Sequence, residues 1–245
     1  MIELNNICKS FYNKQGMKTQ EFKSLENICL EIIPSQITGL IGLNGAGKTT
    51  LLRVIAGLYQ PTQGEMSVKF SSIKEHRVSM LSSEQGLYKH LSVKNLIHYL
   101  GSLQNSDFSF NDDNTKYLIS FLQLEKIIHK QVSALSSGWR QKVLILLAFI
   151  NNPDIILLDE PSNYLDFQGQ EQLSVLINQA REKHKTIIYA SHNLFEIERI
   201  ADSIIFIHQG KVVFHKLKDE MYDDFEGKDN EMNLLDIINY WMPND

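Results

Sequence analysis

The 245-residue sequence predicts an α/β fold with a mostly parallel sheet, an N-terminal antiparallel β subdomain and an inserted helical subdomain. Short apolar runs alternate with segments of helical periodicity, which is typical of parallel strands joined by right-handed crossovers. A glycine-rich turn at residues 42–47 joins one strand to one helix. Between residues 84 and 152 the pattern becomes mainly helical, as expected of a lobe inserted into a core.

The N-terminal part is predicted to be mostly strands. Runs rich in branched and apolar residues predict strands at 2–8, 25–33, 37–41, 66–70 and 78–81. After the glycine turn, apolar residues recur at helical spacing from Leu51 to Leu58, and Gly57 with Pro61 mark the end of that helix. The order strand, glycine turn, helix is thus established before residue 60.

The rest of the chain supplies the lobe and the second half of the core. Helices are expected at 93–103, 115–122, 139–150, 170–183 and 195–200. Strands are expected at 155–158, 186–189, 204–208 and 211–215, the last two joined by a turn at Gln209-Gly210. We therefore assign residues 1–83 and 153–215 to the core, 84–152 to the helical subdomain and 216–245 to a C-terminal tail. In this tail, residues 233–241 predict an amphipathic helix that packs on the body or meets a partner.

Composition excludes several classes of protein. The formal net charge is −5, and the tail carries three basic and nine acidic residues, so no nucleic-acid partner is expected. The longest apolar run, 143–150, is eight residues, whereas a membrane-spanning helix needs about 20. The N-terminus lacks the pattern of a secretion signal. Cys8 and Cys29 are interpreted as buried apolar residues in a reducing cytoplasm rather than as a redox pair.

The glycine turn satisfies the phosphate-loop pattern G-x-x-x-x-G-K-[ST] in the strand–turn–helix context that the pattern requires. Glycines let backbone N–H groups approach a polyphosphate closely. Lys48 is expected to reach the β and γ phosphates, and the Thr49 hydroxyl to ligate Mg²⁺. The nucleotide-binding residues predicted here are Gly42, Asn44, Gly45, Ala46, Gly47, Lys48, Thr49 and Thr50. The motif favours a P-loop NTPase core over a glycine turn with an incidental lysine.

Two acids follow the apolar run Ile155–Leu158. Open α/β sheets bind ligands at the carboxyl ends of their strands, which is where these acids fall. Asp159 continues the strand and is expected to hold Mg²⁺ directly or through water. Glu160 is turned to the opposite side and can accept a proton from the attacking water. The alternative is a solvated acidic strand end, which the phosphate loop makes the weaker interpretation.

Residues 135–142, Leu-Ser-Ser-Gly-Trp-Arg-Gln-Lys, resemble the LSGGQ signature of ATP-binding-cassette (ABC) nucleotide-binding domains. By residue type alone, Ser136 is also a good N-cap for the following helix. In the family, the signature of one subunit contacts the γ-phosphate held by the other. The resemblance therefore implies that Ser136, Ser137 and Gly138 bind a partner's ATP, and that two copies pair head to tail around two ATP molecules.

Three further segments follow the family's order within residues 1–215. The segment 162–166 resembles the D-loop, in which Asp166 would communicate across the dimer; alone it could be a helix cap. Ser191-His192 resembles the switch motif, whose histidine contacts the γ-phosphate and orients water, although a lone histidine is more often structural. Phe11, or less favourably Tyr12, occupies the position of the ring that stacks on adenine, and the alternative is ordinary packing.

One segment departs from the family pattern. Counting back from Gly-Leu-Tyr at 86–88, Ser83 stands where the family places its Q-loop glutamine, and Gln85 lies two residues later. Ser83, Glu84 or Gln85 would then supply the Mg²⁺ contact, and hydrolysis would be slower or differently coupled. The signature also varies, with Ser137 at its second glycine and Trp139 at its glutamine.

The resemblance implies an ATPase subunit of an ABC transporter. A homodimer would bind ATP and Mg²⁺ and close, and ATP hydrolysis would reopen the dimer. The catalytic residues implied are Glu160, His192 and Lys48. Because no membrane span is expected, an integral membrane permease would be a separate partner, bound around residues 83–105. The chain would lie on the cytoplasmic face of the membrane. Likeness to short single-cassette exporters favours efflux. The alternatives are a soluble ABC ATPase with an assembly or mechanical role, and a nucleotide sensor that scarcely hydrolyses ATP.

Overall fold

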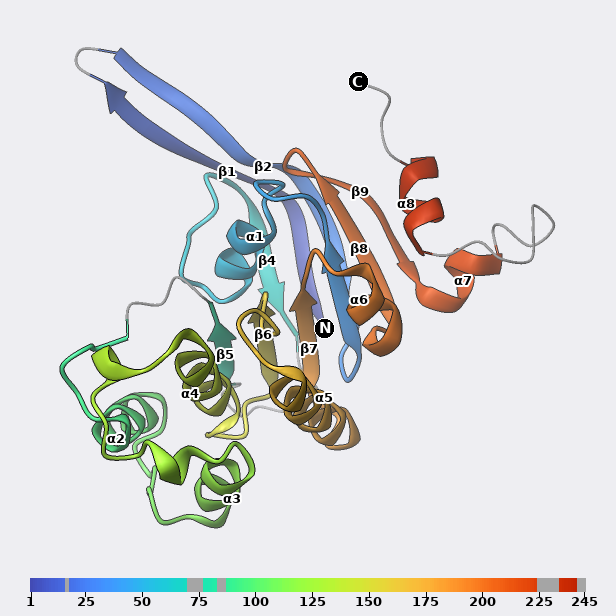
Figure 1. Ribbon diagram of the computed structural model, residues 1–245. Coiled ribbons are helices and arrows are strands. Elements are labelled where there is room, and N and C mark those ends of the chain that lie inside the picture. Colours follow the sequence, from blue (N-terminus) through green and yellow to red (C-terminus); the bar gives the residue numbers. More distant parts are fainter. Residues whose placement is uncertain (16–17, 70–76, 83–86, 224–233, 242–245) are drawn as a thin grey trace. The chain divides into compact units, whose positions relative to one another are not determined.

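The computed structural model describes every residue except 16–17, 70–76, 83–86, 224–233 and 242–245 (Figure 1). The chain divides into two compact units. The first comprises Met1–Glu75 with Thr186–Asp245, and the second comprises His76–Lys185. The helical subdomain expected at 84–152 lies inside the second unit, and its limits stay a prediction.

The first unit contains the antiparallel sheet expected at the N-terminus, with strand order β2-β1-β4. Its strands are β1 (Ile2–Gln15), β2 (Lys18–Ile32) and β4 (Gln63–Val68). The hairpin of β1 and β2 is longer than the predicted runs, because pairing continues from Lys9↔Leu25 out to Gln15↔Lys18 (Figure 1). Polar residues dominate that extension, so hydrophobic alternation gave no signal for it while the backbone ladder still formed.

The predicted burial of both cysteines is wrong. Cys8 is half-buried, Cys29 is exposed, and both are free thiols. The strand period of two explains Cys29, since Ile28 and Leu30 on either side of it are buried and the side chain between them must face outward. Each thiol instead pairs with an asparagine on the opposite strand, Cys8 with Asn27 and Cys29 with Asn6.

The second sheet of this unit has the order β7-β3-β8-β9, with the first three strands parallel and the last antiparallel. The strands are β3 (Ile37–Ile41), β7 (Thr186–Ala190), β8 (Ser203–His208) and β9 (Lys211–Leu217). Every residue of β3 and β7 is buried, as expected for parallel strands covered on both faces. Gln209 and Gly210 have φ of 45° and 76° and form the tight turn predicted between β8 and β9.

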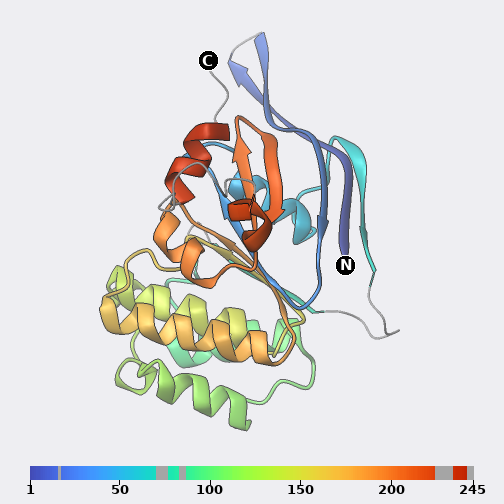
Figure 2. The ribbon, with the colours of Figure 1, turned by 90° about the vertical axis from the view of Figure 1, so that its right-hand side faces the viewer.

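The helices of the first unit are α1 (Lys48–Ile55), α6 (Leu194–Ile200), α7 (Lys218–Asp223) and α8 (Leu234–Trp241). The tail helix α8 lies beside β8 and β9 (Figure 2). Its Trp241 ring is 6.2 Å from the Phe214 ring, and the Lys216 ammonium lies 4.9 Å from the Trp241 ring centre. Ile237 is fully buried. Of the two roles expected for this helix, packing on the body is therefore confirmed.

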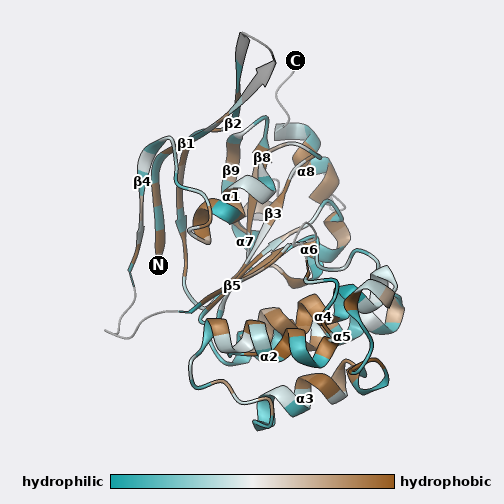
Figure 3. Ribbon diagram, turned by 90° about the vertical axis from the view of Figure 1, so that its left-hand side faces the viewer, coloured by the Kyte–Doolittle hydropathy of each residue, from teal (hydrophilic) through white to brown (hydrophobic). Residues whose placement is uncertain are grey.

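The second unit combines the parallel strands β5 (Val78–Leu81) and β6 (Ile155–Asp159) with four α-helices. These helices are α2 (Val93–Gln104), α3 (Asp113–Phe121), α4 (Ser137–Phe149) and α5 (Phe167–Glu182). Helix α4 is central, because it packs against β5, β6, α2 and α5. Helix α4 is buried from Gln141 to Phe149. Figure 3 shows the hydrophobic segments of this helix in brown.

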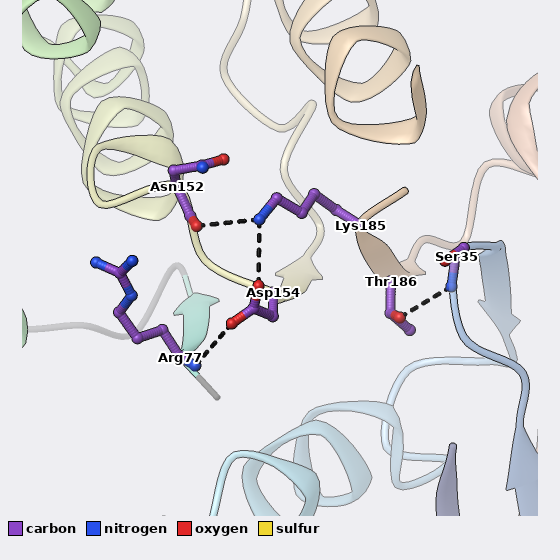
Figure 4. Close-up of polar contacts among 6 residues, drawn as sticks. All are labelled: Ser35, Arg77, Asn152, Asp154, Lys185 and Thr186. Atoms are coloured by element: carbon purple, nitrogen blue, oxygen red, sulfur yellow. Dashed lines mark hydrogen bonds and ion pairs between the residues drawn. The ribbon is translucent and has the colours of Figure 1, made fainter. Parts of the chain in front are cut away.

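Polar contacts fix the starting ends of strands in both units (Figure 4). In the second unit, the Asp154 carboxylate accepts bonds from the Arg77 backbone N–H and the Lys185 ammonium, each at 3.2 Å, just before β5 and β6. In the first unit, the Ser35 N–H donates to the Thr186 hydroxyl at 3.1 Å, at the start of β7. The carboxyl ends of these strands are thus opposite to the ends that these bonds hold.

In the part of the chain that the structure describes, five helices begin at residues whose side chains accept a bond from the first turn. These N-caps are Ser92 for α2, Asp112 for α3, Ser136 for α4, Asp166 for α5 and Asn193 for α6. Helix α1 differs, because its N-cap Gly47 has no side chain to offer. Within the described part of the chain, no helix has both the length and the hydropathy to cross a membrane.

Candidate functional site

The predicted phosphate loop links β3 to α1 in the first unit. Leu43, Asn44 and Gly45 are exposed, Ala46, Gly47 and Lys48 are buried, and Thr49 and Thr50 are half-buried. The Lys48 ammonium donates to the Gly42 carbonyl at 2.7 Å and points back along the loop to the Leu43 carbonyl at 3.4 Å. A positive charge thus lies inside the turn, at the positive end of helix α1.

Two positions of the phosphate loop have no room for a Cβ atom, so only glycine fits them. Gly47 has φ of 110°, and a Cβ there would lie 2.7 Å from the Ser24 carbonyl oxygen. A Cβ at Gly42 would lie 2.3 Å from the Ile207 carbonyl oxygen. The loop therefore requires glycine at both positions, and the glycine N-cap offers no side chain to the first turn of α1.

Two contacts that the sequence did not predict hold the phosphate loop in place. The Gly210 N–H donates to the Ala46 carbonyl at 2.9 Å, and the Ser24 and Thr50 hydroxyls are 2.8 Å apart. Ser24 lies on β2 and Gly210 in the turn between β8 and β9, so two distant segments hold the cradle. The turn was recognisable in the sequence, but its contact with the loop depends on tertiary packing.

His192 is placed at the same edge of the sheet as the phosphate loop. Strand β7 runs parallel to β3, and the Ser191 N–H donates to the Leu40 carbonyl at 3.2 Å, so the two strands end together. His192 follows directly and is exposed. The carboxyl ends of neighbouring parallel strands are where such folds bind ligands.

Glu196, which the sequence did not single out, shapes the segment that carries His192. Its carboxylate accepts bonds from the Tyr189 hydroxyl at 3.0 Å, the Ser191 hydroxyl at 3.3 Å and the Asn193 amide at 3.2 Å. These three residues flank His192 on both sides. A single carboxylate therefore fixes the turn between β7 and α6, which no short motif could have indicated.

Phe11 lies on β1 and is half-buried. Its ring meets the Tyr59 ring edge-on at 5.5 Å, and the Lys9 ammonium lies 5.4 Å from its centre. The neighbouring Tyr12 is exposed. Phe11 thus belongs to a small aromatic and cationic cluster in the first unit, and its role toward adenine stays a prediction.

The two predicted acids lie at the end of β6 in the second unit. Asp159 is the last residue of the strand and is 4% exposed, whereas Glu160 is half-buried. Glu160 has φ of 49°, a left-handed conformation that is uncommon for a residue with a side chain. The backbone therefore turns sharply at Glu160. The roles predicted for the two carboxylates stay predictions.

The tip of α4 carries the signature residues. Leu135 is buried, while Ser136 and Ser137 are exposed and Gly138 is half-buried. The predicted cap is confirmed, since the Ser136 hydroxyl accepts from the Trp139 N–H at 3.4 Å. The tip of α4 is thus exposed to solvent at Ser136 and Ser137, next to the buried Leu135.

Asp166 caps α5, because its carboxylate accepts from the Gly169 N–H at 2.8 Å. The alternative interpretation of Asp166 as a helix cap is thus confirmed, and its role across a dimer stays a prediction. Ser83 and Gln85, the candidate Q-loop residues, lie outside the described residues. The first unit brings His192 and the phosphate loop to one sheet edge, and the second places Asp159 and Glu160 beside α4.

Comparisons with known proteins identify the family of the chain. A family model described as "ABC transporter" matches residues 25–163, and one described as "AAA domain, putative AbiEii toxin, Type IV TA system" matches 130–198. The chain is 33% identical over 240 residues to "ABC transporter ATP-binding protein NatA" of Bacillus subtilis, covering 94% of both chains. It is 35% identical over 211 residues to "Zinc import ATP-binding protein ZnuC" of Rickettsia conorii, covering 85% of this chain and 83% of that protein.

A solved structure shares the fold. The structure titled "Dimeric structure of a post-hydrolysis state of the ATP-binding cassette MJ0796 bound to ADP and Pi" has a TM-score of 0.76 and 24% identity to this chain. The match covers 89% of this chain and 98% of that one.

Proposed function

The chain belongs to the family of ABC transporter ATP-binding proteins, and we propose that it is the ATP-hydrolysing subunit that drives a separate membrane permease. The observation that carries the proposal is the cradle between β3 and α1. There the buried Lys48 ammonium lies inside a loop of glycines, at a helix start that has no side-chain cap. Such a cradle suits a polyphosphate better than any other common ligand.

ATP binding is proposed to use the whole loop. Backbone N–H groups from Gly45 to Thr50 surround the phosphates, and Lys48 leaves the Gly42 carbonyl to bind the β and γ phosphates. Exchange of a carbonyl partner for a phosphate strengthens the bond, because both groups are then charged. Phe11 is proposed to pack against the adenine ring.

Mg²⁺ is proposed to be held by Thr49 and Asp159, whose hydroxyl and carboxylate oxygens are the donors that this ion prefers. Asp159 is a nearly fully buried acid at the carboxyl end of a strand, which is where such folds bind their ligands. The ion would neutralise charge on the phosphate oxygens. A further ligand from Ser83 or Gln85 belongs to the same proposal.

Hydrolysis is proposed to depend on two groups. Glu160 accepts the proton of the attacking water, and His192 contacts the γ-phosphate and helps to orient that water. Glu160 thus contributes proton transfer, and His192 contributes positioning of the reactants. Enzymes accelerate phosphoryl transfer mainly by positioning the reactants and stabilising charge.

Two copies are proposed to close head to tail around two ATP molecules. Ser136, Ser137 and Gly138 of one copy would bind the γ-phosphate held by Lys48 of the other, and Asp166 would communicate across the interface. The exposed hydroxyls at the tip of α4 support this proposal. Because the γ-phosphate joins the copies only before hydrolysis, its cleavage shifts the pair toward the open state.

The permease is proposed to bind on the cytoplasmic side of the membrane around residues 83–105, and transport is proposed to be outward. The family relatives include a zinc import protein, so the direction rests on the signature and the short tail alone. The second candidate is a single-cassette ATPase in an assembly or mechanical role. It shares every nucleotide-binding residue and differs only in its partner.

Purification of the tagged chain from detergent-solubilised native membranes tests the proposal. We expect an integral membrane protein to co-purify in fixed stoichiometry, whereas a stoichiometric complex with soluble proteins alone would favour the assembly ATPase. A Glu160→Gln variant purified in the presence of ATP should retain the partner, since it is expected to bind nucleotide without hydrolysing it. Mass spectrometry of the co-purified chain identifies which outcome holds.

A further inference from the structure

Glu160 has a backbone conformation that its sequence context disfavours. Its φ of 49° lies in the left-handed region, which residues with a side chain seldom adopt. The next residue is Pro161, and a following proline favours extended backbone instead. A conformation disfavoured on both counts persists only where surrounding groups hold it, and such positions concentrate at functional sites.

A side chain of the signature helix supplies such a hold. The Gln141 amide donates to the Pro161 carbonyl at 2.7 Å, and Gln141 is 2% exposed. Pro161 is also buried. A short bond shielded from water is strong, and its loss leaves the carbonyl without that donor in a dry environment. The carbonyl that it fixes belongs to the residue directly after Glu160.

The same face of α4 continues along the loop after Glu160. Gly138 lies one turn before Gln141, so the two residues share a helix face. A Cβ at Gly138 would lie 2.9 Å from the Tyr164 carbonyl oxygen, which shows how closely helix and loop approach. Helix α4 therefore contacts the loop at two carbonyls, one near each end.

The loop also bonds to itself. The Asn163 N–H donates to the Glu160 carbonyl at 3.3 Å, and the Leu165 N–H donates to the Ser162 carbonyl at 3.1 Å. These local turns give the loop its shape but do not tie it to another element. The Gln141 bond adds that tie, and it comes from the helix whose tip carries Ser136.

We propose that Gln141 is a positioning residue for Glu160: by holding the Pro161 carbonyl, it fixes the direction in which the Glu160 carboxylate leaves the backbone. The inference rests on the proposed function and extends it. Ser136 acts on ATP bound to the partner copy, whereas Gln141, 5 residues further along the same helix, acts on the carboxylate of its own chain.

Gln172 offers a matched control on α5. It is 7% exposed, its amide donates to the Phe121 carbonyl, and its oxygen accepts from the Lys142 ammonium at 2.8 Å. Both glutamines are thus buried, and both bond a backbone carbonyl in the second unit. Because Gln172 makes an additional bond, Gln172→Leu should destabilise the fold at least as much as Gln141→Leu.

The test compares ATP hydrolysis and ATP affinity in the full-length leucine variants. We expect Gln141→Leu to lower kcat about tenfold or more with ATP affinity within about twofold of wild type, and Gln172→Leu to leave kcat within about twofold. Combined with Glu160→Gln, Gln141→Leu should not reduce the residual single-turnover rate further, because its effect passes through the missing carboxylate. If Gln141→Leu fails to fold, Gln141→Asn keeps the amide but shortens its reach, and should lower kcat in the same selective way.

Different results would overturn this inference and the function on which it rests. Equal losses of kcat in Gln141→Leu and Gln172→Leu, or a further loss on top of Glu160→Gln, would overturn the positioning role alone. Hydrolysis that survives Glu160→Gln undiminished would overturn the assignment of Glu160, and the role of Gln141 with it.

Discussion

The two helix tips proposed to hold one ATP molecule differ in whether a side chain caps the N–H groups of the first turn. Helix α1 begins at Gly47 and has no side-chain cap, whereas α4 begins at Ser136, whose hydroxyl accepts a bond from its own helix at 3.4 Å. At the first tip, therefore, no N-cap side chain competes with a phosphate for the N–H groups of the first turn. The tip of α4 is already capped by its own Ser136. It can therefore add to binding only where a second site already holds the phosphate close to it.

The tips also differ in charge and burial. Lys48 is buried at the start of α1, whereas Ser136 at the start of α4 is neutral and exposed. A buried ammonium binds a phosphate more strongly than a solvated hydroxyl does. From this comparison we propose that affinity for ATP resides in the phosphate loop, while the signature adds the second copy.

The largest expected effect separates binding from hydrolysis. Glu160→Gln removes the proposed base but neither tip, so ATP should bind normally while phosphate release falls about 100-fold or more, the usual range for loss of general base catalysis. Dimers should accumulate on ATP addition, because both tips keep their ligand. Phosphate release and size-exclusion chromatography measure the two effects. Unimpaired hydrolysis would remove Glu160 from the site.

Lys48→Ala tests the tip that is proposed to carry affinity. Loss of a charge-assisted contact to phosphate of about 1.5–3 kcal/mol predicts an ATP affinity lower by about tenfold to 100-fold. Calorimetric titration of the isolated chain with ATP measures this change. An unchanged dissociation constant would contradict the phosphate-loop assignment.

Ser136→Asp tests the other tip without loss of its cap. Aspartate caps a helix about as well as serine, so the free energy of unfolding should change by less than about 0.5 kcal/mol. Its charge should repel the partner's γ-phosphate, so we expect hydrolysis to fall about tenfold while ATP affinity of the monomer is unchanged. Ser136→Ala is the control that removes the cap without adding charge. If Ser136→Asp weakens ATP binding at protein concentrations where the chain is a monomer, the tip of α4 contributes to ATP binding in its own chain, which would contradict the proposed difference between the tips.

The smallest expected effect concerns the support of the phosphate loop. Ser24→Ala removes the 2.8 Å contact between the Ser24 and Thr50 hydroxyls. We expect the free energy of unfolding to fall by about 1 kcal/mol, the usual worth of one such bond, with ATP affinity reduced less than about threefold. Denaturant melts with and without ATP measure both. A loss of affinity as large as that of Lys48→Ala would show that the support is part of the binding site.

The sequence predicted most of the fold where local signals were strong. Glycine, lysine and threonine at fixed spacing identified the turn before α1, and Ser136 identified the start of α4, since such residues act through backbone conformation and neighbours close in sequence. The end of β6 was also predictable, because an apolar run there gives way to Asp159 and Glu160. The local structure of each segment was thus readable from the segment alone.

What the sequence could not predict were contacts between distant segments. Gln141 bonds a residue 20 positions away, and Gly210 bonds the loop at Ala46 from the far end of the chain. Nothing in a glutamine or a turn glycine indicates such a partner. The outward-facing Cys29 was misjudged for a similar reason, because its residue type suggested burial while the strand register decided its direction.

The most direct test of the central claim, that one phosphate is held by two copies, is to mix two impaired variants. Lys48→Ala damages the cradle of its own chain, and Ser136→Asp damages the tip offered to its partner. A mixed dimer of the two variants would contain one site with both defects and one intact site. The account predicts that the mixture recovers hydrolysis to about a quarter of the wild-type rate per chain, since about half of the dimers are mixed and each has one working site. A rate no higher than that of the two variants measured separately would contradict it.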